Sequence, residues 1–189
     1  MKQKNLIYDK FELINKFSKL SDFKEYLTNL KYKTIGTNKG IKYINLSCTI
    51  DIEVSSFYDD AGEKVGLPYC FTLGVNGHSY LGRTKDDLLN LLSFIIDVFC
   101  LSKENRMIFY IQNLSYEFQF FMKWFKWVSV CALKQRTPVK ATTSDGLEFR
   151  CSFLLSGYSL AKVGEQLQKY KVQKMVGDLD YRKIRTPLR

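Results

Sequence analysis

Apolar and polar residues alternate along residues 42–54, "KYINLSCTIDIEV", and this pattern predicts a β-strand. Residues 69–75 and 79–83 repeat the alternation on either side of an Asn-Gly pair, which favours the type I′ turn of a β-hairpin. Residues 106–111, "RMIFYI", predict a buried strand, and residues 147–155 predict another after the turn "SDG". The chain therefore contains the strands of a sheet that pairs both neighbouring and distant segments.

Apolar residues at helical spacing predict four helices, at residues 9–30, 86–101, 114–127 and 159–170. In the first of them Phe11, Ile14 and Phe17 carry the spacing. Thr84 and Asp87 form a capping box before the second, which we expect to be a core helix. The resulting order β, β-hairpin, α, β, α, β, α predicts an α/β fold with a mixed central sheet flanked by helices. Ligands of such folds usually bind at the ends of the strands.

The composition of the 189 residues fits one domain with a substantial core, because 46% of them are hydrophobic. The formal net charge of +10 favours a polyanionic partner such as nucleic acid. The most apolar stretch, residues 86–101, is too short and too acidic to span a bilayer, so no membrane partner is expected. Five widely spaced cysteines predict buried, reduced thiols and a cytoplasmic protein. A single histidine, His78, and the lack of C-x-x-C argue against a zinc site.

Two acidic segments are candidates for chemistry. Asp51 and Glu53 are two residues apart in a predicted strand, so their side chains point to the same face. That pair is either a solvated strand edge or half of a site for a hard metal ion. Asn113 and Glu117 follow the strand of residues 106–111 into a helix that is rich in aromatic residues. Asn113 either caps the helix or faces a ligand, and Glu117 either complements the helix dipole or belongs to a site.

The two acidic segments, "DIEVSSF" and "NLSYEF", resemble the first and second exonuclease motifs of protein-primed, phage-type family B DNA polymerases. "YSLAKV" resembles the (S/T)-L-x-x-h motif of this family, which contacts single-stranded DNA. "VGDLDYRKIR" is similar to the G-D-(I/L)-D-Y segment that follows it. The four matches occur in the order of the family and extend from Asp51 to Arg185.

The resemblance implies an RNase H-like (DnaQ-like) 3′–5′ exonuclease domain that removes mispaired nucleotides during DNA replication, in a protein encoded by a phage or prophage and located in the cytoplasm of a bacterial host. It implies that Asp51, Glu53 and Glu117 are catalytic carboxylates that hold Mg²⁺ or Mn²⁺. Carboxylates are the ligands that these ions prefer for phosphodiester hydrolysis. The residues implied to hold the DNA primer terminus are Ser55, Asn113, Tyr116, Ser159 and Leu160. Basic residues are further candidates for phosphate attraction, namely Lys123, Lys126, Lys134 and Arg136.

The chain departs from the family in two ways. Glu117 occupies a position where the family usually has Asp, and the third motif, Y-x-x-x-D, does not follow before the final "RTPLR". We therefore expect the front portion of a larger polymerase, truncated before the third motif. It is either a truncated or split gene product, with the polymerase part as a separate chain, or a separately encoded exonuclease-like domain. Asp178 or Asp180 is an alternative source of the last metal ligand, although the resemblance gives neither of them that role.

The expected organisation is a basic N-terminal appendage at residues 1–44, an exonuclease-like core at residues 45–170 and a basic C-terminal tail at residues 171–189. Three functions remain open. The chain is a metal-dependent exonuclease, a non-catalytic module that binds single-stranded DNA, or a protein-interaction domain derived from the same fold.

Overall fold

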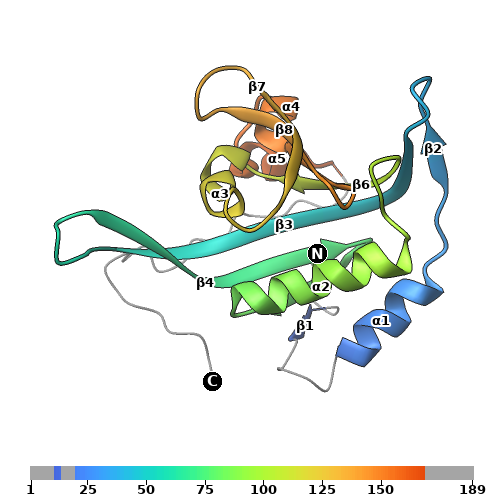
Figure 1. Ribbon diagram of the computed structural model, residues 1–189, viewed down its shortest axis with the longest axis horizontal. Coiled ribbons are helices and arrows are strands. Elements are labelled where there is room, and N and C mark those ends of the chain that lie inside the picture. Colours follow the sequence, from blue (N-terminus) through green and yellow to red (C-terminus); the bar gives the residue numbers. More distant parts are fainter. Residues whose placement is uncertain (1–10, 14–19, 169–189) are drawn as a thin grey trace.

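The computed structural model describes residues 11–13 and 20–168, which fold into a mixed α/β structure with helices flanking a central sheet (Figure 1). Within these residues the sheet has nine strands: β1 (Phe11–Leu13), β2 (Thr34–Gly36), β3 (Lys42–Tyr58), β4 (Lys64–Val75), β5 (His78–Gly82), β6 (Asn105–Ile111), β7 (Trp127–Ala132), β8 (Pro138–Thr143) and β9 (Leu147–Cys151). The helices are α1 (Leu20–Asn29), α2 (Lys85–Val98), α3 (Leu114–Phe121), α4 (Ser152–Ser156) and α5 (Leu160–Gln166). None of the helices in the described residues is long and apolar enough to cross a membrane.

The strands are ordered β1-β5-β4-β3-β6-β9-β8-β7, and β2 pairs separately with β3. β3 is antiparallel to β4 and parallel to β6, and β9 is parallel to β6. β5 is antiparallel to β4, and β7 and β8 form an antiparallel hairpin beside β9. Because β3, β6 and β9 run in the same direction, their C-terminal ends meet at one edge of the sheet, where ligands usually bind in α/β folds.

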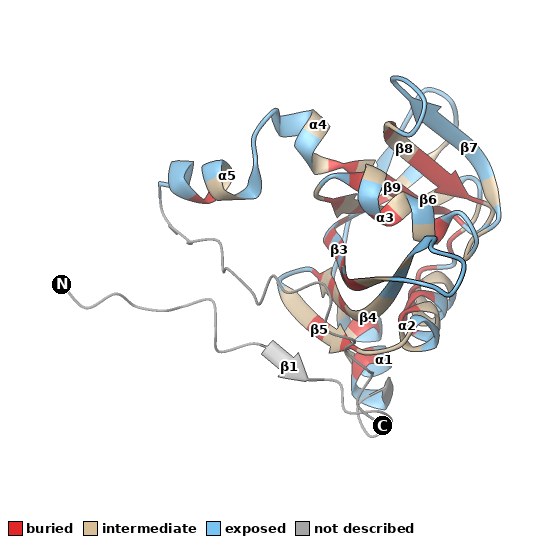
Figure 2. Cartoon of the chain, turned by 90° about the vertical axis from the view of Figure 1, so that its left-hand side faces the viewer, coloured by how far each residue is buried: buried red, intermediate tan, exposed pale blue. Residues whose placement is uncertain are grey.

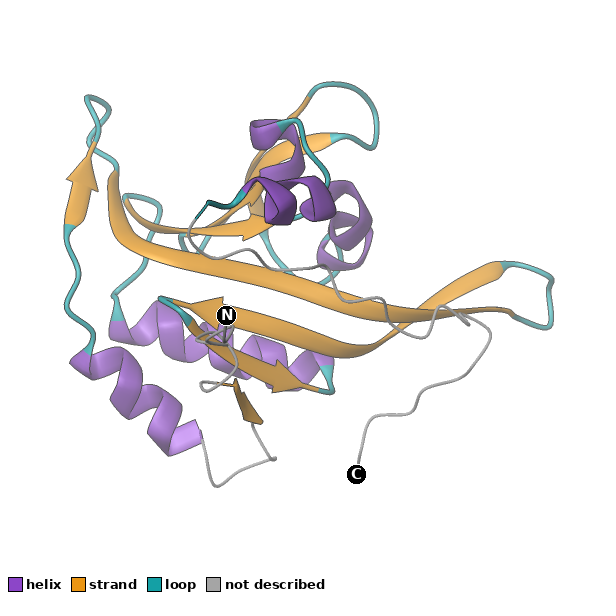
Figure 3. Ribbon diagram, turned by 180° about the vertical axis from the view of Figure 1, so that it is seen from behind, coloured by secondary structure: helices purple, strands orange, loops and turns teal. Residues whose placement is uncertain are grey.

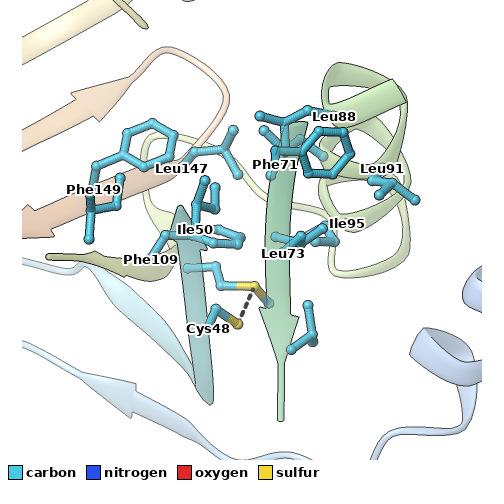
Figure 4. Packing of buried hydrophobic residues seen from close by; sticks show 14 of the residues in the cluster. Cys48, Ile50, Phe71, Leu73, Leu88, Leu91, Ile95, Phe109, Leu147 and Phe149 are labelled. Atoms are coloured by element: carbon cyan, nitrogen blue, oxygen red, sulfur yellow. Dashed lines mark hydrogen bonds between the residues drawn. The ribbon is translucent and has the colours of Figure 1, made fainter. Parts of the chain in front are cut away.

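The core lies against the even-numbered face of β3. Ile44, Cys48, Ile50 and Ile52 are buried, whereas the odd-numbered residues between them are polar and mostly exposed. Leu88 and Ile95 of α2 pack against β4 next to this face, as Figure 4 shows. The predicted capping box begins α2, because Thr84 Oγ1 accepts from Asp87 N at 3.0 Å and Asp87 Oδ2 accepts from Thr84 N at 3.2 Å. Such a box typically contributes about 1 kcal/mol.

The predicted hairpin joins β4 to β5. Asn76 and Gly77 have φ angles of 48° and 87°, the left-handed conformation that a type I′ turn requires at both central positions. The expected helix at residues 9–30 is confirmed over α1 but is wrong at β1, which pairs in parallel with β5. Sheet pairing with an existing edge overrides the helical spacing there, and residues 14–19 lie outside the described residues.

The segment between α3 and β9 differs from the prediction. The expected helix at residues 114–127 ends at Phe121, and the chain then forms the β7–β8 hairpin, in which β7 is exposed and β8 largely buried (Figure 2). Phe125 and Trp127 still pack on Phe149, with ring centroids 5.3 and 5.8 Å away. The aromatic spacing therefore reflects contacts with one cluster rather than a continuous helix. Likewise, the strand expected over residues 147–155 ends at Cys151, where α4 begins.

The boundary expected after residue 44 falls inside β3. Residues before it contribute to the core, since Phe23 and Leu27 of α1 are each 1% exposed and β2 pairs with β3. The expected tail at residues 171–189, with Asp178 and Asp180, lies outside the described residues. All five cysteines are free, but the expectation that they are buried holds only for Cys48 and Cys151. Cys100 follows the end of α2 and Cys131 lies on the edge strand β7, and both are exposed, whereas Cys70 of β4 is half-buried.

Candidate functional site

A cleft of about 830 Å³ opens where β3 and β6 meet the segments that follow β6 and β9. It is lined by residues from three distant parts of the sequence. All the metal-site and primer-terminus residues that the resemblance implies, except Ser55, are among them: Asp51, Glu53, Asn113, Tyr116, Glu117, Ser159 and Leu160. We call it the acidic cleft. The fold thus gathers the three segments on which the sequence interpretation rests.

Asp51 and Glu53 are exposed on the odd-numbered face of β3. Their cross-strand partners on β4 are Thr72 and Cys70. The pairing register shifts after Glu53, because Tyr69 of β4 is an extra residue between the partners Cys70 and Pro68, and Val54 and Ser55 are both buried. The extra residue belongs to β4, so it does not interrupt the alternation of β3 that places the two acids on one face.

Glu117 lies in the first turn of α3 and is 3% exposed. Burial raises the pKa of its carboxyl from 4.5 to about 8; a backbone hydrogen bond at Glu117 lowers the pKa in part, and the charges of Asp51 and Glu53 raise it further. Its Oε2 atom is buried and has no hydrogen-bond partner among the described residues. A buried carboxylate oxygen without a partner is costly in a fold unless a ligand or a proton satisfies it.

Asn113 occupies the N-cap position of α3 with φ 62° and ψ 58°, and its side chain makes no capping hydrogen bond. The capping alternative is therefore not supported, and Asn113 is one of the residues that line the cleft. One turn further on, Tyr116 is 39% exposed, with its ring edge-on to Phe120 at 6.0 Å between centroids. An exposed aromatic ring supported from behind presents a face on which a nucleic-acid base can stack.

Ser159 and Leu160 form another part of the cleft wall, at the start of α5. Ser159 caps this helix, since its Oγ accepts from Lys162 N at 3.3 Å, and Leu160 is 51% exposed. Gln112, at the end of β6, joins this wall to the sheet. Its Nε2 donates to Tyr158 O at 3.3 Å, and its Oε1 accepts from Ser152 Oγ at 2.8 Å.

Several predicted residues lie elsewhere. Ser55 is 1% exposed and is not among the residues that line the cleft. The four basic candidates also lie outside the lining; all are exposed, Lys123 and Lys126 between α3 and β7 and Lys134 and Arg136 in the β7–β8 turn. The sequence interpretation did not include five further lining residues with polar or aromatic side chains: Thr49, Tyr110, Gln112, Ser152 and Phe153. Tyr110 and Gln112 could have been predicted to lie near a ligand, because they are at the C-terminal end of a parallel strand.

The donor set fits a hard divalent cation in its chemistry. Asp51, Glu53 and Glu117 supply carboxylate oxygens around one cleft, and the Oε2 atom of Glu117 lacks a partner. In the part of the chain that the structure describes, no three Asp, Glu, His or Cys side chains lie close enough together to hold an ion. The acids therefore surround the cleft without forming a ready-made coordination shell.

Comparisons with known proteins add no family assignment: no family model, no curated protein and no solved structure matches this chain.

Proposed function

We propose that this chain is an RNase H-like 3′–5′ exonuclease domain of the type found in protein-primed family B DNA polymerases, acting on the ends of single-stranded DNA. One observation carries the proposal. Residues from the two exonuclease-like motifs and from the S-L-x-x-h-like motif line a single cleft, although more than one hundred residues separate Asp51 from Ser159. Chance matches to short motifs have no reason to converge on one cleft of the fold.

The strand order supports the same proposal. The run β5-β4-β3-β6-β9, in which β4 alone is antiparallel to the other four, is the arrangement expected of an RNase H-like sheet. In that arrangement the first exonuclease motif belongs on the central strand, and β3 carries "DIE" in this position. The β7–β8 hairpin is then an addition beside β9.

Five side chains of the cleft have a role in the proposed reaction. Asp51, Glu53 and Glu117 would hold Mg²⁺ or Mn²⁺, which when bound makes a water nucleophilic at neutral pH and stabilises the leaving oxygen. Tyr116 offers its exposed ring to the terminal base, and Asn113 offers an amide to the base or sugar. Because the amide both donates and accepts hydrogen bonds, it suits a terminus of any sequence.

The test is the degradation of a 5′-labelled single-stranded oligonucleotide in Mg²⁺ or Mn²⁺. We expect stepwise shortening from the 3′ end by the intact chain and none by the isosteric double variant Asp51→Asn, Glu53→Gln. The matched control is Asp60→Asn, Glu63→Gln, which removes the same two charges from exposed positions near the β3–β4 turn. Absence of shortening by folded protein, or equal shortening by all three proteins, would refute the proposed activity.

A second function is favoured by the separation of the carboxylates. Since no three acidic side chains of the described residues form an ion site, the cleft also suits a module that binds single-stranded DNA without cleaving it. This alternative predicts salt-dependent binding that survives Asp51→Asn, Glu53→Gln but weakens in Tyr116→Ala. Folded protein that neither binds nor cleaves DNA would instead favour a protein-interaction domain.

A further inference from the structure

A buried glutamate organises cationic side chains on the sheet, outside the acidic residues of the cleft. Glu148 of β9 is 0% exposed and accepts a hydrogen bond from Arg150 Nε at 2.8 Å and one from Arg106 Nη1 at 3.2 Å. Tyr43 Oη and Thr142 Oγ1 donate to it at 3.1 and 3.3 Å. Tyr43 belongs to β3, Arg106 to β6 and Thr142 to β8, and Arg150 lies on β9 with Glu148. The network therefore connects four strands of the sheet.

Glu148 is ionised in this setting. Burial alone would raise the pKa of its carboxyl, but hydrogen bonds and positive charge from Arg150, together with the charge of Lys140, lower the pKa below its ordinary value. One carboxylate thus faces three cations, since Arg106, Arg150 and Lys140 all lie close to it. The surplus of positive charge remains on this part of the sheet.

The strand register shows where this charge lies. Thr49 of β3 pairs with Tyr110 of β6, Tyr110 pairs with Arg150 of β9, and Arg150 pairs with Lys140 of β8. Directly paired residues share a face, so these four form one row across the sheet. The opposite face of the same strands carries Phe149, on which α3 packs through Phe121.

The row continues directly from the acidic cleft. Thr49 and Tyr110 line the cleft, and Asp51 follows Thr49 by two residues on the same face of β3. Three inter-strand spacings of about 4.8 Å place Lys140 about 14 Å from β3. The side chain of Arg150 is 29% exposed, and its guanidinium carbon lies 5.4 Å from the ring centroid of Tyr43. We call Arg150 and Lys140 the basic row.

We propose that the basic row binds the phosphates of single-stranded DNA whose end occupies the acidic cleft, an inference that rests on the proposed function of that cleft. The positive charges of the row attract the phosphates of DNA, and the row lies on the same continuous sheet as the cleft. Glu148 fixes the guanidinium of Arg150 from beneath, so that less side-chain entropy is lost when a phosphate binds. The four basic residues expected from the sequence are not part of this row.

The test is fluorescence anisotropy in EDTA, which measures binding without cleavage, using labelled thymidine oligonucleotides of about four and about twelve nucleotides. The variant is Lys140→Gln, and the matched control is Lys24→Gln on α1, which packs against α2 away from the row. We expect Lys140→Gln to weaken binding of the longer oligonucleotide about three- to tenfold and to reduce its salt dependence by about 0.7 in the slope of log K against log salt. Binding of the shorter one should not change.

The outcomes separate this inference from the proposed function. If Lys140→Gln binds both oligonucleotides like the control, with the same salt slope, the basic row does not bind the DNA phosphates, even where nuclease activity is present. If the length-dependent loss occurs in a protein without nuclease activity, the row stands and the catalytic proposal fails. Arg150→Lys keeps the charge but loses the paired hydrogen bonds to Glu148, so it should weaken binding of the longer oligonucleotide less than Lys140→Gln does. Wild-type binding by Arg150→Lys would remove Arg150 from the basic row.

Discussion

Replacing Glu117 by Gln removes a buried negative charge and keeps the shape of the side chain. In the folded protein the pKa of Glu117 is raised to about 8, mainly by burial, whereas an unfolded chain has the ordinary value near 4.5. Below pH 4.5 both states carry the proton, and the charge has no effect on stability. Between the two pKa values the unfolded state releases the proton and the folded state retains it, so stability falls as the pH rises. Above about pH 8 the loss is complete.

The size of the effect follows from the interval between the pKa values. Each pH unit in that interval corresponds to about 1.4 kcal/mol, and the whole interval to roughly 4–5 kcal/mol. We therefore expect Glu117→Gln to exceed the wild type in free energy of unfolding by less than about 1 kcal/mol at pH 5 and by roughly 3–5 kcal/mol at pH 8.5. Few substitutions in a natural core are stabilising by this amount.

Urea denaturation in EDTA at pH 5, 7 and 8.5 measures this difference, with unchanged slopes showing that the transition itself is unaltered. Glu25→Gln, an exposed position on α1, is the control and should follow the wild type at every pH. Parallel stability curves for wild type and Glu117→Gln, or a variant that is less stable at pH 8.5, would contradict the assignment of Glu117 as a buried carboxyl without a partner.

Two further predictions concern the cleft. Mn²⁺ at about one hundred times its dissociation constant should raise the midpoint of thermal unfolding by about 5–10 °C in the wild type and leave Asp51→Asn, Glu53→Gln unchanged, as differential scanning fluorimetry would show; equal shifts would mean that the ion binds elsewhere. Asn113→Gly should unfold like the wild type because glycine accepts φ 62°, whereas Asn113→Ala should lose about 1 kcal/mol of stability. Both Asn113 variants should lose affinity for single-stranded DNA, and wild-type affinity in the glycine variant would remove Asn113 from the site.

The sequence predicted most strongly those elements whose pattern has a local cause. The hairpin between β4 and β5 follows from Asn76 and Gly77, and the start of α2 follows from Thr84 and Asp87, because each of these features depends on a few neighbouring residues. The acids of β3 were also predictable, since alternation fixes which face they share.

Long-range contacts account for what the pattern did not predict. The β7–β8 hairpin contains an aromatic spacing that resembles a helix, and its packing on Phe149 is visible only in three dimensions. Ser55 is buried, although the alternation of β3 groups it with the exposed residues Asp51 and Glu53. The sequence did not predict the network around Glu148, because this residue is a single acid in a strand and its partners Arg106 and Tyr43 are 42 and 105 residues away.

β3 extends beyond β6, the strand that pairs with one of its two edges. Its pairing with β6 stops at Thr49, whereas its pairing with β4 extends to Tyr58, and Figures 1 and 3 show the two-stranded ribbon that results. Beyond Thr49 no described strand covers this edge of β3, and Ile50 and Ile52 line the cleft there. Main-chain amides and carbonyls at such an edge are strong hydrogen-bonding groups that carry no preference for a base. In the proposed function, single-stranded DNA in the cleft would therefore meet the polypeptide backbone of β3 itself, a contact surface that no side-chain substitution removes.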